Sequence, residues 1–311
     1  MWIKERRFTM AKRQDVSMIM AIPKVEYVKN SYEKMGVRIE TPYKDYNIIF
    51  RCLREAWFRL HLPYRKIWFN DRVKELSTDM IYIRDPLITP EFVGWVCDMF
   101  PEKRVVVVYT NRASYATVLP ADIETDNLEF ASYDEDDCQK YQMRFYSPKY
   151  MSMYRFEPEE KCQPEYDVIY LGRDKGRAKM LFSLQSEFEE LGLKTYFHIC
   201  ASRTFMRYNH RYYKPEMKYT DYIELLKRTR SHLNIVPEGQ KSITQREMES
   251  IFDQVKCITN NHGIMDFELY DPSRFFVLGI DPIEKLPDFL RTEFKPVSES
   301  KLAQYEDTCH Y

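Results

Sequence analysis

"YDVIYLGRDKGRAKMLFSLQSEFEELGLKTYFHICA", residues 166–201, decides the fold class of this chain. It opens with a short apolar run typical of a buried strand, continues with helical periodicity, and closes with a second apolar run. The same order of strand and helix repeats through residues 219–261, which end in the run "VKCITNN". Strands that alternate with helices in this way predict a parallel sheet with helices on both faces.

The first half of the chain shows the same alternation less regularly. Its clearest buried strand is "KRVVVVYTN", residues 103–111, and apolar runs at 16–22 and 79–86 predict two more. We therefore expect an α/β protein with two Rossmann-like, doubly wound domains that face a cleft. The expected parts are an N-terminal acceptor-side domain, a polar and proline-containing linker, a nucleotide-sugar domain and a C-terminal helix or tail, at residues 1–150, 151–165, 166–285 and 286–311.

Composition narrows the class of protein. Hydrophobic residues make up 44% of the 311 residues, which is enough for a folded core, and the net charge of -1 argues against nucleic acid as a partner. The seven cysteines are dispersed without a C-x-x-C pair, a pattern that favours a reducing compartment over disulfides or structural zinc. No apolar stretch approaches the roughly 20 residues of a spanning helix. We therefore expect a cytoplasmic protein.

Two predicted strand ends in the second half carry groups suited to chemistry. In "YLGRDKGR", residues 170–177, Gly172 allows a tight turn and Lys175 and Arg177 lie beside the free N–H groups of a starting helix. That combination suits a phosphate, because helix N-termini and cations both attract anions. The alternative is a basic turn whose side chains are only solvated.

The second strand end leads into "SITQREMES", residues 242–250. Ser242 and Gln245 have the spacing of a capping box, which predicts the start of a helix there. Arg246 and Glu249 then fall on one face, where an exposed ion pair contributes only about 0.2–0.5 kcal/mol. We interpret Arg246 as a group that meets an anionic ligand, with an ordinary exposed ion pair as the alternative.

These stretches resemble a known family. "QKSITQREME", "KCITNN" and "FELYDPSR" are similar to the recurrent core of GT-B-type glycosyltransferase-like proteins encoded with bacterial capsular and lipopolysaccharide genes. "YLGRDKGR", "RVVVVYTN" and "ASYDEDDCQKY" resemble further motifs of that family, so the resemblance extends from about residue 79 to 277. It says little about the substrate.

The resemblance implies a donor nucleotide on the second domain and an acceptor on the first. It implies that the donor-binding residues are Gly172, Asp174, Lys175, Arg177, Thr244, Arg246 and Glu249. Three positions depart from the family pattern: Ser242 replaces a glycine, Thr110 a tryptophan and Asn260 a threonine. The first change narrows the space expected beside the nucleotide, and the second bears on the type of acceptor.

Glycosyl transfer requires the charge that develops on the leaving diphosphate to be neutralised, and cationic side chains with helix N-termini can do this without a metal. We therefore expect no metal or other cofactor, with Arg246 acting on the donor phosphate. Asp85, at the end of a predicted strand, is the candidate base for the acceptor hydroxyl. The cluster "DEDD", residues 134–137, is interpreted as an acidic helix start rather than a metal site.

The expected function is transfer of a sugar, in the manner of a hexosyltransferase, from a nucleotide-activated donor to a surface polysaccharide or a lipid-linked oligosaccharide. A catalytically silent nucleotide- or glycan-binding partner is the alternative, and a dinucleotide-dependent enzyme ranks lower because no G-x-G-x-x-G follows a strand. Basic and aromatic residues mix at residues 1–14 and 201–218, a composition that suits peripheral contact with the inner face of a membrane. The alternatives are a frayed terminal tail for the first segment and a solvated loop for the second.

Overall fold

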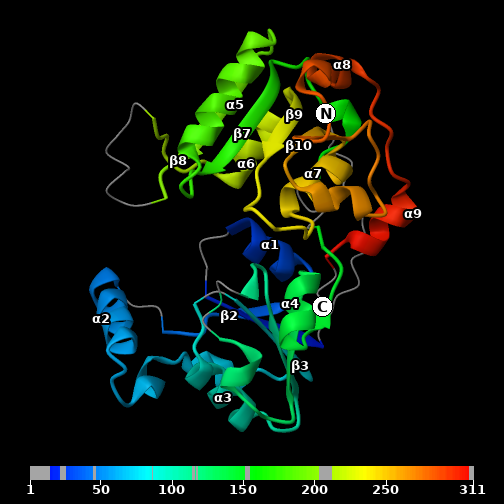
Figure 1. Ribbon diagram of the computed structural model, residues 1–311. Coiled ribbons are helices and arrows are strands. Elements are labelled where there is room, and N and C mark those ends of the chain that lie inside the picture. The colour runs from blue at the N-terminus through cyan, green and yellow to red at the C-terminus, as the bar shows by residue number, and fades with distance from the viewer. Residues whose placement is uncertain are drawn as a thin grey trace, which may run out of the picture. The chain divides into compact units, whose positions relative to one another are not determined.

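The computed structural model describes residues 15–21, 26–44, 47–85, 87–113, 116, 118–150, 155–202 and 212–307. The chain folds as two compact units: unit 1, which extends to Ser147, and unit 2, which comprises Pro148–Asp307 (Figure 1). Each unit is built on a parallel sheet of its own.

Unit 1 contains a six-stranded parallel sheet in the order β2-β1-β3-β4-β5-β6. Its strands are β1 (Val16–Met20), β2 (Arg38–Glu40), β3 (Met80–Arg84), β4 (Arg104–Val108), β5 (Leu128–Ser132) and β6 (Arg144–Phe145). Its helices are α1 (Glu26–Lys34), α2 (Ile48–Arg59), α3 (Pro90–Met99) and α4 (Glu135–Tyr141), with short 3-10 helices η1 (Arg65–Trp68), η2 (Asp71–Glu75) and η4 (Pro120–Asp122).

Alternating side chains of these strands face opposite sides of the sheet, and both sides are covered. Ile83 and Val107 lie in one core with Phe92 of α3. On the other side Arg84 lies over the ring of Tyr32 from α1, 5.9 Å from its centroid. The buried apolar runs of the sequence therefore form a doubly wound layer, as predicted.

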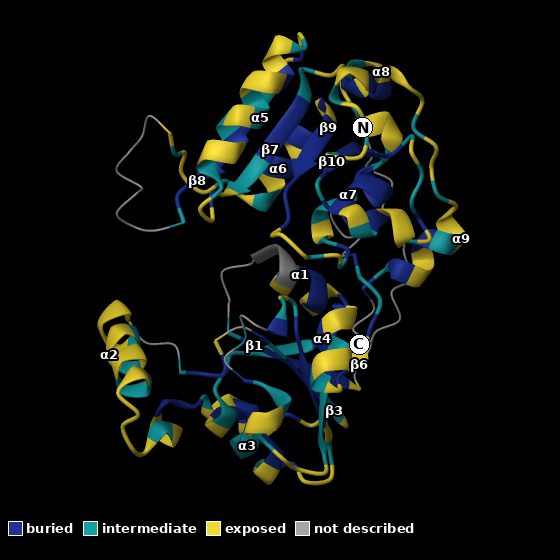
Figure 2. Cartoon of the chain, in the orientation of Figure 1, coloured by how far each residue is buried: buried dark blue, intermediate teal, exposed yellow. Residues whose placement is uncertain are grey.

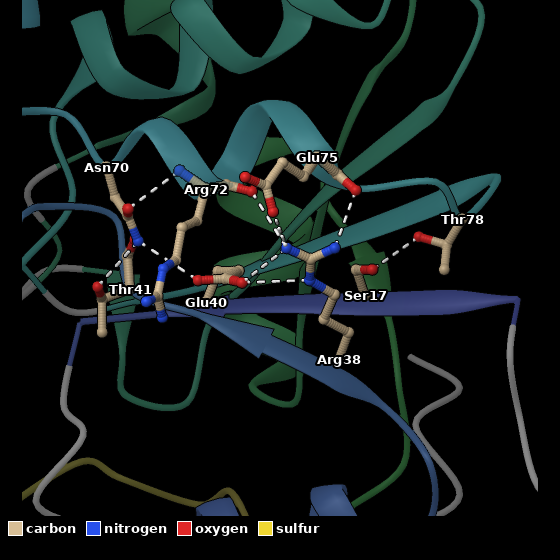
Figure 3. A network of polar contacts seen from close by, with 8 residues as sticks. All are labelled: Ser17, Arg38, Glu40, Thr41, Asn70, Arg72, Glu75 and Thr78. Carbon is tan, nitrogen blue, oxygen red and sulfur yellow. Dashed lines mark hydrogen bonds and ion pairs between the residues drawn. The ribbon is translucent and has the colours of Figure 1, made fainter.

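A polar network holds the β2 edge of this sheet (Figure 3). Arg38 donates to Glu40 at 3.1 Å and 3.0 Å, and to the carboxylate and main-chain oxygen of Glu75 at 3.0 Å and 2.9 Å. Asn70 donates to the carbonyl of Thr41 at 2.9 Å. Because β2 is an edge strand, these contacts tie it to the η2 segment through side chains instead of a further strand.

Unit 2 contains a five-stranded parallel sheet in the order β11-β10-β9-β7-β8. Its strands are β7 (Tyr166–Arg173), β8 (Thr195–Cys200), β9 (Thr229–Asn234), β10 (Lys256–Thr259) and β11 (Phe275–Val277). Its helices are α5 (Ala178–Glu190), α6 (Tyr219–Leu226), α7 (Gln245–Asp253), α8 (Leu286–Arg291) and α9 (Glu299–Leu302), with 3-10 helices η6 (Pro158–Glu160), η8 (His262–Asp266), η9 (Ile283–Lys285) and η10 (Ala303–Tyr305).

Both faces of this second sheet carry helices. Val168 packs in one core with residues of α5 and α8, whereas its neighbour Ile169 packs on the opposite face with residues of α6. Cys257 of β10 packs with residues of α7, on the same face of the sheet as Ile169. The described part of the predicted linker, from Arg155 onward, packs on this unit, where Arg155 donates to the carbonyl of Phe252 at 3.1 Å.

The two sheets share one topology. Numbered along the chain within each unit, the strands of both lie in the order 2-1-3-4-5, with a sixth strand added in unit 1. Strand order reverses between β1 and β3 in unit 1 and between β7 and β9 in unit 2. Doubly wound sheets bind ligands at the carboxyl ends of the strands beside such a reversal. In the described parts of the chain, no helix is long and apolar enough to cross a bilayer.

Candidate functional site

The turn that leaves β7 lies at the strand reversal of unit 2. Lys175 and Gly176 both have positive φ, of 45° and 81°, before the chain enters α5. The N–H of Arg177 closes the turn on the carbonyl of Asp174 at 2.7 Å. A positive φ is easy for Gly176 and unfavourable for a lysine, so the surrounding contacts must hold Lys175 in this conformation.

Asp174 supplies those contacts. It is only 2% exposed and accepts hydrogen bonds from the N–H of Ser202 at 3.0 Å and the hydroxyl of Tyr213 at 3.1 Å. The Ser202 hydroxyl also donates to Asp174 and accepts from the N–H of Lys175, the latter at 2.7 Å. Burial alone would raise the pKa of Asp174, but these hydrogen bonds outweigh it and lower the pKa. Asp174 therefore braces the turn as a carboxylate.

The N-terminus of α5 is open. Arg177 is its N-cap residue and provides no side-chain cap, and the first turn contains no acidic residue. The N–H groups of Ala178, Lys179 and Met180 have no acceptor among the described residues. Free N–H groups at the positive end of a helix form a ready site for an anion.

Two cationic side chains flank this helix end. Lys175 is an exposed residue, and its ammonium has no hydrogen bond or ion pair with any described residue. Its pKa is lowered by partial burial and by the positive charges of Arg177 and Arg173, which an anion would offset. Arg177 instead donates to the carbonyls of Ile235 and Asp174, and so joins the ends of β7 and β9 across the reversal.

Gly172 lies inside β7, ahead of the turn, where it pairs with Ile199 of β8. A Cβ at this position would come within 2.8 Å of the Tyr170 hydroxyl, which itself donates to the carbonyl of Arg173 at 3.3 Å. Gly172 therefore leaves room for a side chain that supports the turn.

The second predicted helix start is displaced. The predicted capping pair of Ser242 and Gln245 is wrong by two residues, because α7 begins at Gln245 with Thr244 as its N-cap. Thr244 and Glu247 form the capping box, in which the Thr244 N–H donates to the Glu247 carboxylate at 2.7 Å. The pattern Thr-x-x-Glu was present in the sequence and fits the capping-box spacing with an acidic third residue.

Glu247 is a buried carboxyl that the sequence analysis missed. It is 0% exposed and has no cationic partner in the described chain; every group that contacts it is a neutral donor. Besides Thr244, these donors are Asn234 at 3.1 Å, Thr259 at 3.1 Å and Asn261 at 3.2 Å. Burial raises the pKa of Glu247 despite these hydrogen bonds. The carboxyl links the ends of β9, α7 and β10 into one assembly.

Arg246 and Glu249 lie together, as their spacing predicts, with 2.7 Å between guanidinium and carboxylate. The pair is not an ordinary surface pair, because Glu249 is 1% exposed and the Arg246 side chain is 26% exposed. Arg246 also lies 3.9 Å from the ring centroid of Tyr222. Burial alone would lower the pKa of Arg246, but the charge of Glu249 outweighs it and raises the pKa.

Glu249 has no acceptor site to spare in this arrangement. One carboxylate oxygen accepts from Tyr219 and Gln245, both at 3.1 Å, and the other accepts from Tyr222 at 3.0 Å and from Arg246. A carboxylate offers about four acceptor positions. The hydroxyl of Thr244 is likewise engaged, by Asn234 at 3.1 Å and by Glu247.

In unit 1, Asp85 follows β3 at the carboxyl edge of its sheet. It is 5% exposed and accepts from the hydroxyl of Thr110 at 2.8 Å, from the Thr110 N–H, and from Asn111 at 3.4 Å. Burial raises the pKa of Asp85 even with these bonds. Thr110, one of the departures from the family pattern, is therefore the residue that holds the Asp85 carboxyl.

The acidic cluster at residues 134–137 starts a helix, as predicted. Asp134 is the N-cap of α4 and accepts from the N–H of Asp137 at 3.0 Å. Asp137 accepts from the N–H of Ala113 at 2.6 Å. Within the described residues, no group of three or more histidine, cysteine, aspartate or glutamate side chains is placed to hold a metal ion.

The two segments considered for membrane contact lie mostly outside the description. Residues 1–14 and 203–211 are not described. Among the described residues of the second segment, Tyr213 bonds to Asp174, and the ammonium of Lys214 lies 4.1 Å from the ring centroid of Tyr196.

Comparison with known proteins supports the architecture. No protein-family model and no curated protein matches the sequence. Among solved structures, the chain is similar to AviGT4, described as a glycosyltransferase involved in avilamycin A biosynthesis, with a TM-score of 0.52 and 10% identity over 89% of this chain and 88% of that one. The predicted fold of two Rossmann-like α/β domains, GT-B-like in class, is thereby confirmed.

Proposed function

We propose that the protein is a glycosyltransferase that takes a sugar from a nucleoside-diphosphate donor bound on unit 2. The observation that carries the proposal is the open N-terminus of α5 at the strand reversal of the sheet, where the first N–H groups and the ammonium of Lys175 have no partner among the described residues. The likeness of the fold to that of a glycosyltransferase supports it.

The donor diphosphate would lie against this helix end. Negative charge grows on the diphosphate as the glycosidic bond breaks, and preorganised N–H dipoles and cations stabilise it most where they need no rearrangement. Lys175 and the α5 N–H groups supply that stabilisation without a metal ion. Asp174 and Arg177 hold the turn in the conformation that presents them.

Arg246 contributes a second cation to the donor phosphate in this proposal. Its side chain is 26% exposed, and Glu249 and the ring of Tyr222 fix its position. We assign Glu249 and Thr244 to positioning, since their acceptor atoms are already engaged within the protein. Gly172 supports the turn from inside β7.

Asp85 is the proposed base for the acceptor hydroxyl on unit 1. Its raised pKa makes it a stronger base than an exposed aspartate, which favours proton removal. The acceptor class we propose is a surface polysaccharide or lipid-linked oligosaccharide, with a hexose as the transferred sugar. This assignment rests on the sequence resemblance to glycosyltransferase-like proteins of bacterial capsular and lipopolysaccharide clusters, and implies a cytoplasmic reaction without nucleic acid.

A catalytically silent nucleotide- or glycan-binding partner is the second candidate. It is favoured by the departures from the family pattern at Ser242 and Thr110, of which Thr110 is hydrogen-bonded to the proposed base Asp85. Turnover separates the two candidates, because a silent partner binds nucleotide without releasing it from a sugar donor.

A thermal-shift screen against UDP, GDP, CDP, CMP, TDP and NAD, with and without EDTA, tests the proposal. A nucleotide present at 100 times its dissociation constant stabilises the protein by about 2.7 kcal/mol. A shift with one nucleoside diphosphate or CMP that EDTA does not change is the expected result. A shift with NAD alone, or with none of the panel, would contradict the donor site.

A further inference from the structure

Helix α2 of unit 1 is unusual because none of its residues is buried. Figure 2 shows it in the colours of exposed and intermediate residues along its length. Its apolar residues Ile49, Leu53, Ala56 and Leu60 (the last is its C-cap) are spaced by four, three and four, and so form one stripe. Such a stripe normally packs on a core, but here Ile49 is 72% exposed and Leu60 is 67% exposed.

The exposed apolar surface continues beyond the helix. We define the α2 face as the exposed large apolar side chains of this stripe and of the segment that follows it, namely Ile49, Leu53, Leu60, Leu62, Tyr64 and Ile67. Tyr64 and Ile67 are 81% and 52% exposed. Exposed apolar side chains gathered in one segment mark an interaction site more often than single exposed ones do.

The opposite side of α2 fixes the direction of this face. Phe58 meets Tyr43 with ring centroids 5.3 Å apart, and the Arg54 guanidinium lies 4.5 Å from the same ring centroid. Arg65, in η1, pairs with Glu91. These contacts hold the helix on unit 1 through one side and leave the stripe on the other.

Charge indicates what covers the α2 face. Residues 47–67 contain five basic residues and one acidic residue, Glu55, a net charge of +4 from 5 minus 1. Arg59 and Lys66 are exposed, and their side chains have no partner among the described residues. Arg59 directly precedes Leu60, so its charge lies about 100° from the stripe around the helix.

An apolar face bordered by unpaired cations matches the boundary between headgroups and acyl chains in an anionic bilayer. A second copy of α2 fits less well, because two segments of charge +4 repel each other. The face also extends beyond the helix to Leu62, Tyr64 and Ile67, whereas a helix pair buries a narrow seam along two helices.

We infer that the α2 face binds the surface of an anionic lipid bilayer, with the apolar side chains inserted and Arg59 and Lys66 among the headgroups. The inference stands on this face alone and does not depend on the nucleotide site. It also gives the chain a described membrane-contact element, separate from the two segments considered in the sequence.

Co-sedimentation of the full chain with vesicles tests this. One vesicle set contains phosphatidylcholine only, and the other contains phosphatidylcholine with phosphatidylglycerol. We expect binding to the anionic vesicles that falls at high salt, since salt screens the headgroup attraction. The double variant Ile49→Ser with Leu60→Ser should lower the partition coefficient by about tenfold or more. Arg59→Ser with Lys66→Ser should lower it by roughly twentyfold on anionic vesicles only.

The matched control is Ile280→Ser with Met265→Ser, which removes exposed apolar side chains from unit 2 and should leave vesicle binding unchanged. Sedimentation without lipid reports self-association. No binding of the native chain to anionic vesicles, or undiminished binding by the Ile49 and Leu60 variant, overturns the inference. If the native chain self-associates without binding vesicles, and the Ile49 and Leu60 variant does not self-associate, the α2 face would instead bind a second copy of the chain. The nucleotide thermal shift is a separate readout, so its absence would count only against the proposed function.

Discussion

The carboxyl edges of the two sheets share a topology but differ in the charge at their helix N-termini. In unit 1, Thr89 caps the N-terminus of α3, which has Glu91 in its first turn. Asp134 caps α4, and three further acidic residues lie in the first turn of that helix. In unit 2, α5 begins without a side-chain cap or an acid in its first turn. Among the described helix starts, those of α3 and α4 are therefore closed to an anion, whereas the start of α5 is open to one.

Helix α7 shows that the difference is local rather than a property of a whole unit. It belongs to unit 2, yet Thr244 and Glu247 satisfy its N-terminus from within. Its cation, Arg246, is held by a carboxylate. The lesson is that cap chemistry, not strand order, decides which helix end is free for a ligand.

The largest effect is expected in unit 1. Asp85→Asn removes the proposed base while its amide can keep a hydrogen bond with Thr110, so turnover should fall by about 100-fold or more. Nucleotide binding should be unchanged, because unit 2 is untouched. Steady-state kinetics with a sugar nucleotide measures the first and calorimetry the second. The turnover of the native protein should also fall as the pH is lowered. Because the pKa of Asp85 is raised, this fall should begin at a higher pH than it would for an ordinary aspartate. Full activity in the variant would remove Asp85 from the chemistry.

Glu247→Ala tests the internal cap of α7. It removes one acceptor from each of the buried donors Asn234, Thr259 and Asn261 and breaks the capping box, so we expect a loss of about 3 kcal/mol in the free energy of unfolding. All four tryptophans precede residue 147, so their fluorescence reports unit 1 while circular dichroism reports both units.

Urea unfolding should therefore move the dichroism transition more than the fluorescence transition. The exposed Glu293→Ala serves as the control and should move neither. An unfolding free energy equal to that of the native chain would show that the five contacts of Glu247 contribute little.

Asp253, at the last turn of α7, gives a pH dependence of smaller size. It is 1% exposed and accepts from the Tyr150 hydroxyl at 2.8 Å, and burial raises its pKa to about 8. Between pH 4 and 8 the native carboxyl keeps a proton that the unfolded chain releases, so the free energy of unfolding should fall as pH rises. We expect a fall of about 2 kcal/mol between pH 6 and 8 from this group.

Asp253→Asn should remove that part of the slope in unfolding experiments at pH 6, 7 and 8. The exposed Asp266→Asn keeps the native slope and serves as the control. If the unfolding free energy of the Asp253 variant depends on pH as strongly as that of the native chain, the pH dependence belongs to another group.

The sequence predicted the parts of the fold that depend on local pattern. Apolar runs such as residues 104–108 are buried strands, and the turn at 170–177 leads into a helix at the carboxyl edge. The partners of Glu249 could not be predicted, because Tyr219 and Tyr222 come from another helix and meet it only in the folded chain. The exposure of α2 could not be predicted from the sequence either, because its apolar periodicity is the pattern of a helix that packs on a core.

The start of α7 shows a different kind of error. Both Ser242 and Thr244 precede the helix, and either hydroxyl can cap one. The choice is decided by Glu247, whose carboxylate reaches back to Thr244 and is fixed by Asn234 and Asn261 from elsewhere in the unit. The Thr-x-x-Glu spacing was present in the sequence, and tertiary contacts select it over the pairing of Ser242 with Gln245.

The central claim is that the open end of α5 binds the donor diphosphate. It is tested most directly by placing an acidic residue in the first turn of α5, as in α3 and α4 of unit 1. Lys179→Glu places an acid in the exposed first turn of α5, and Lys194→Glu makes the same change at the opposite edge, where β8 begins. An acid at a helix N-terminus stabilises the helix by about 0.3–1 kcal/mol, so Lys179→Glu should not unfold the chain. Calorimetric titration with the nucleoside diphosphate found in the screen should show affinity at least about tenfold weaker in Lys179→Glu and unchanged in Lys194→Glu. Equal affinity in both variants would contradict the claim.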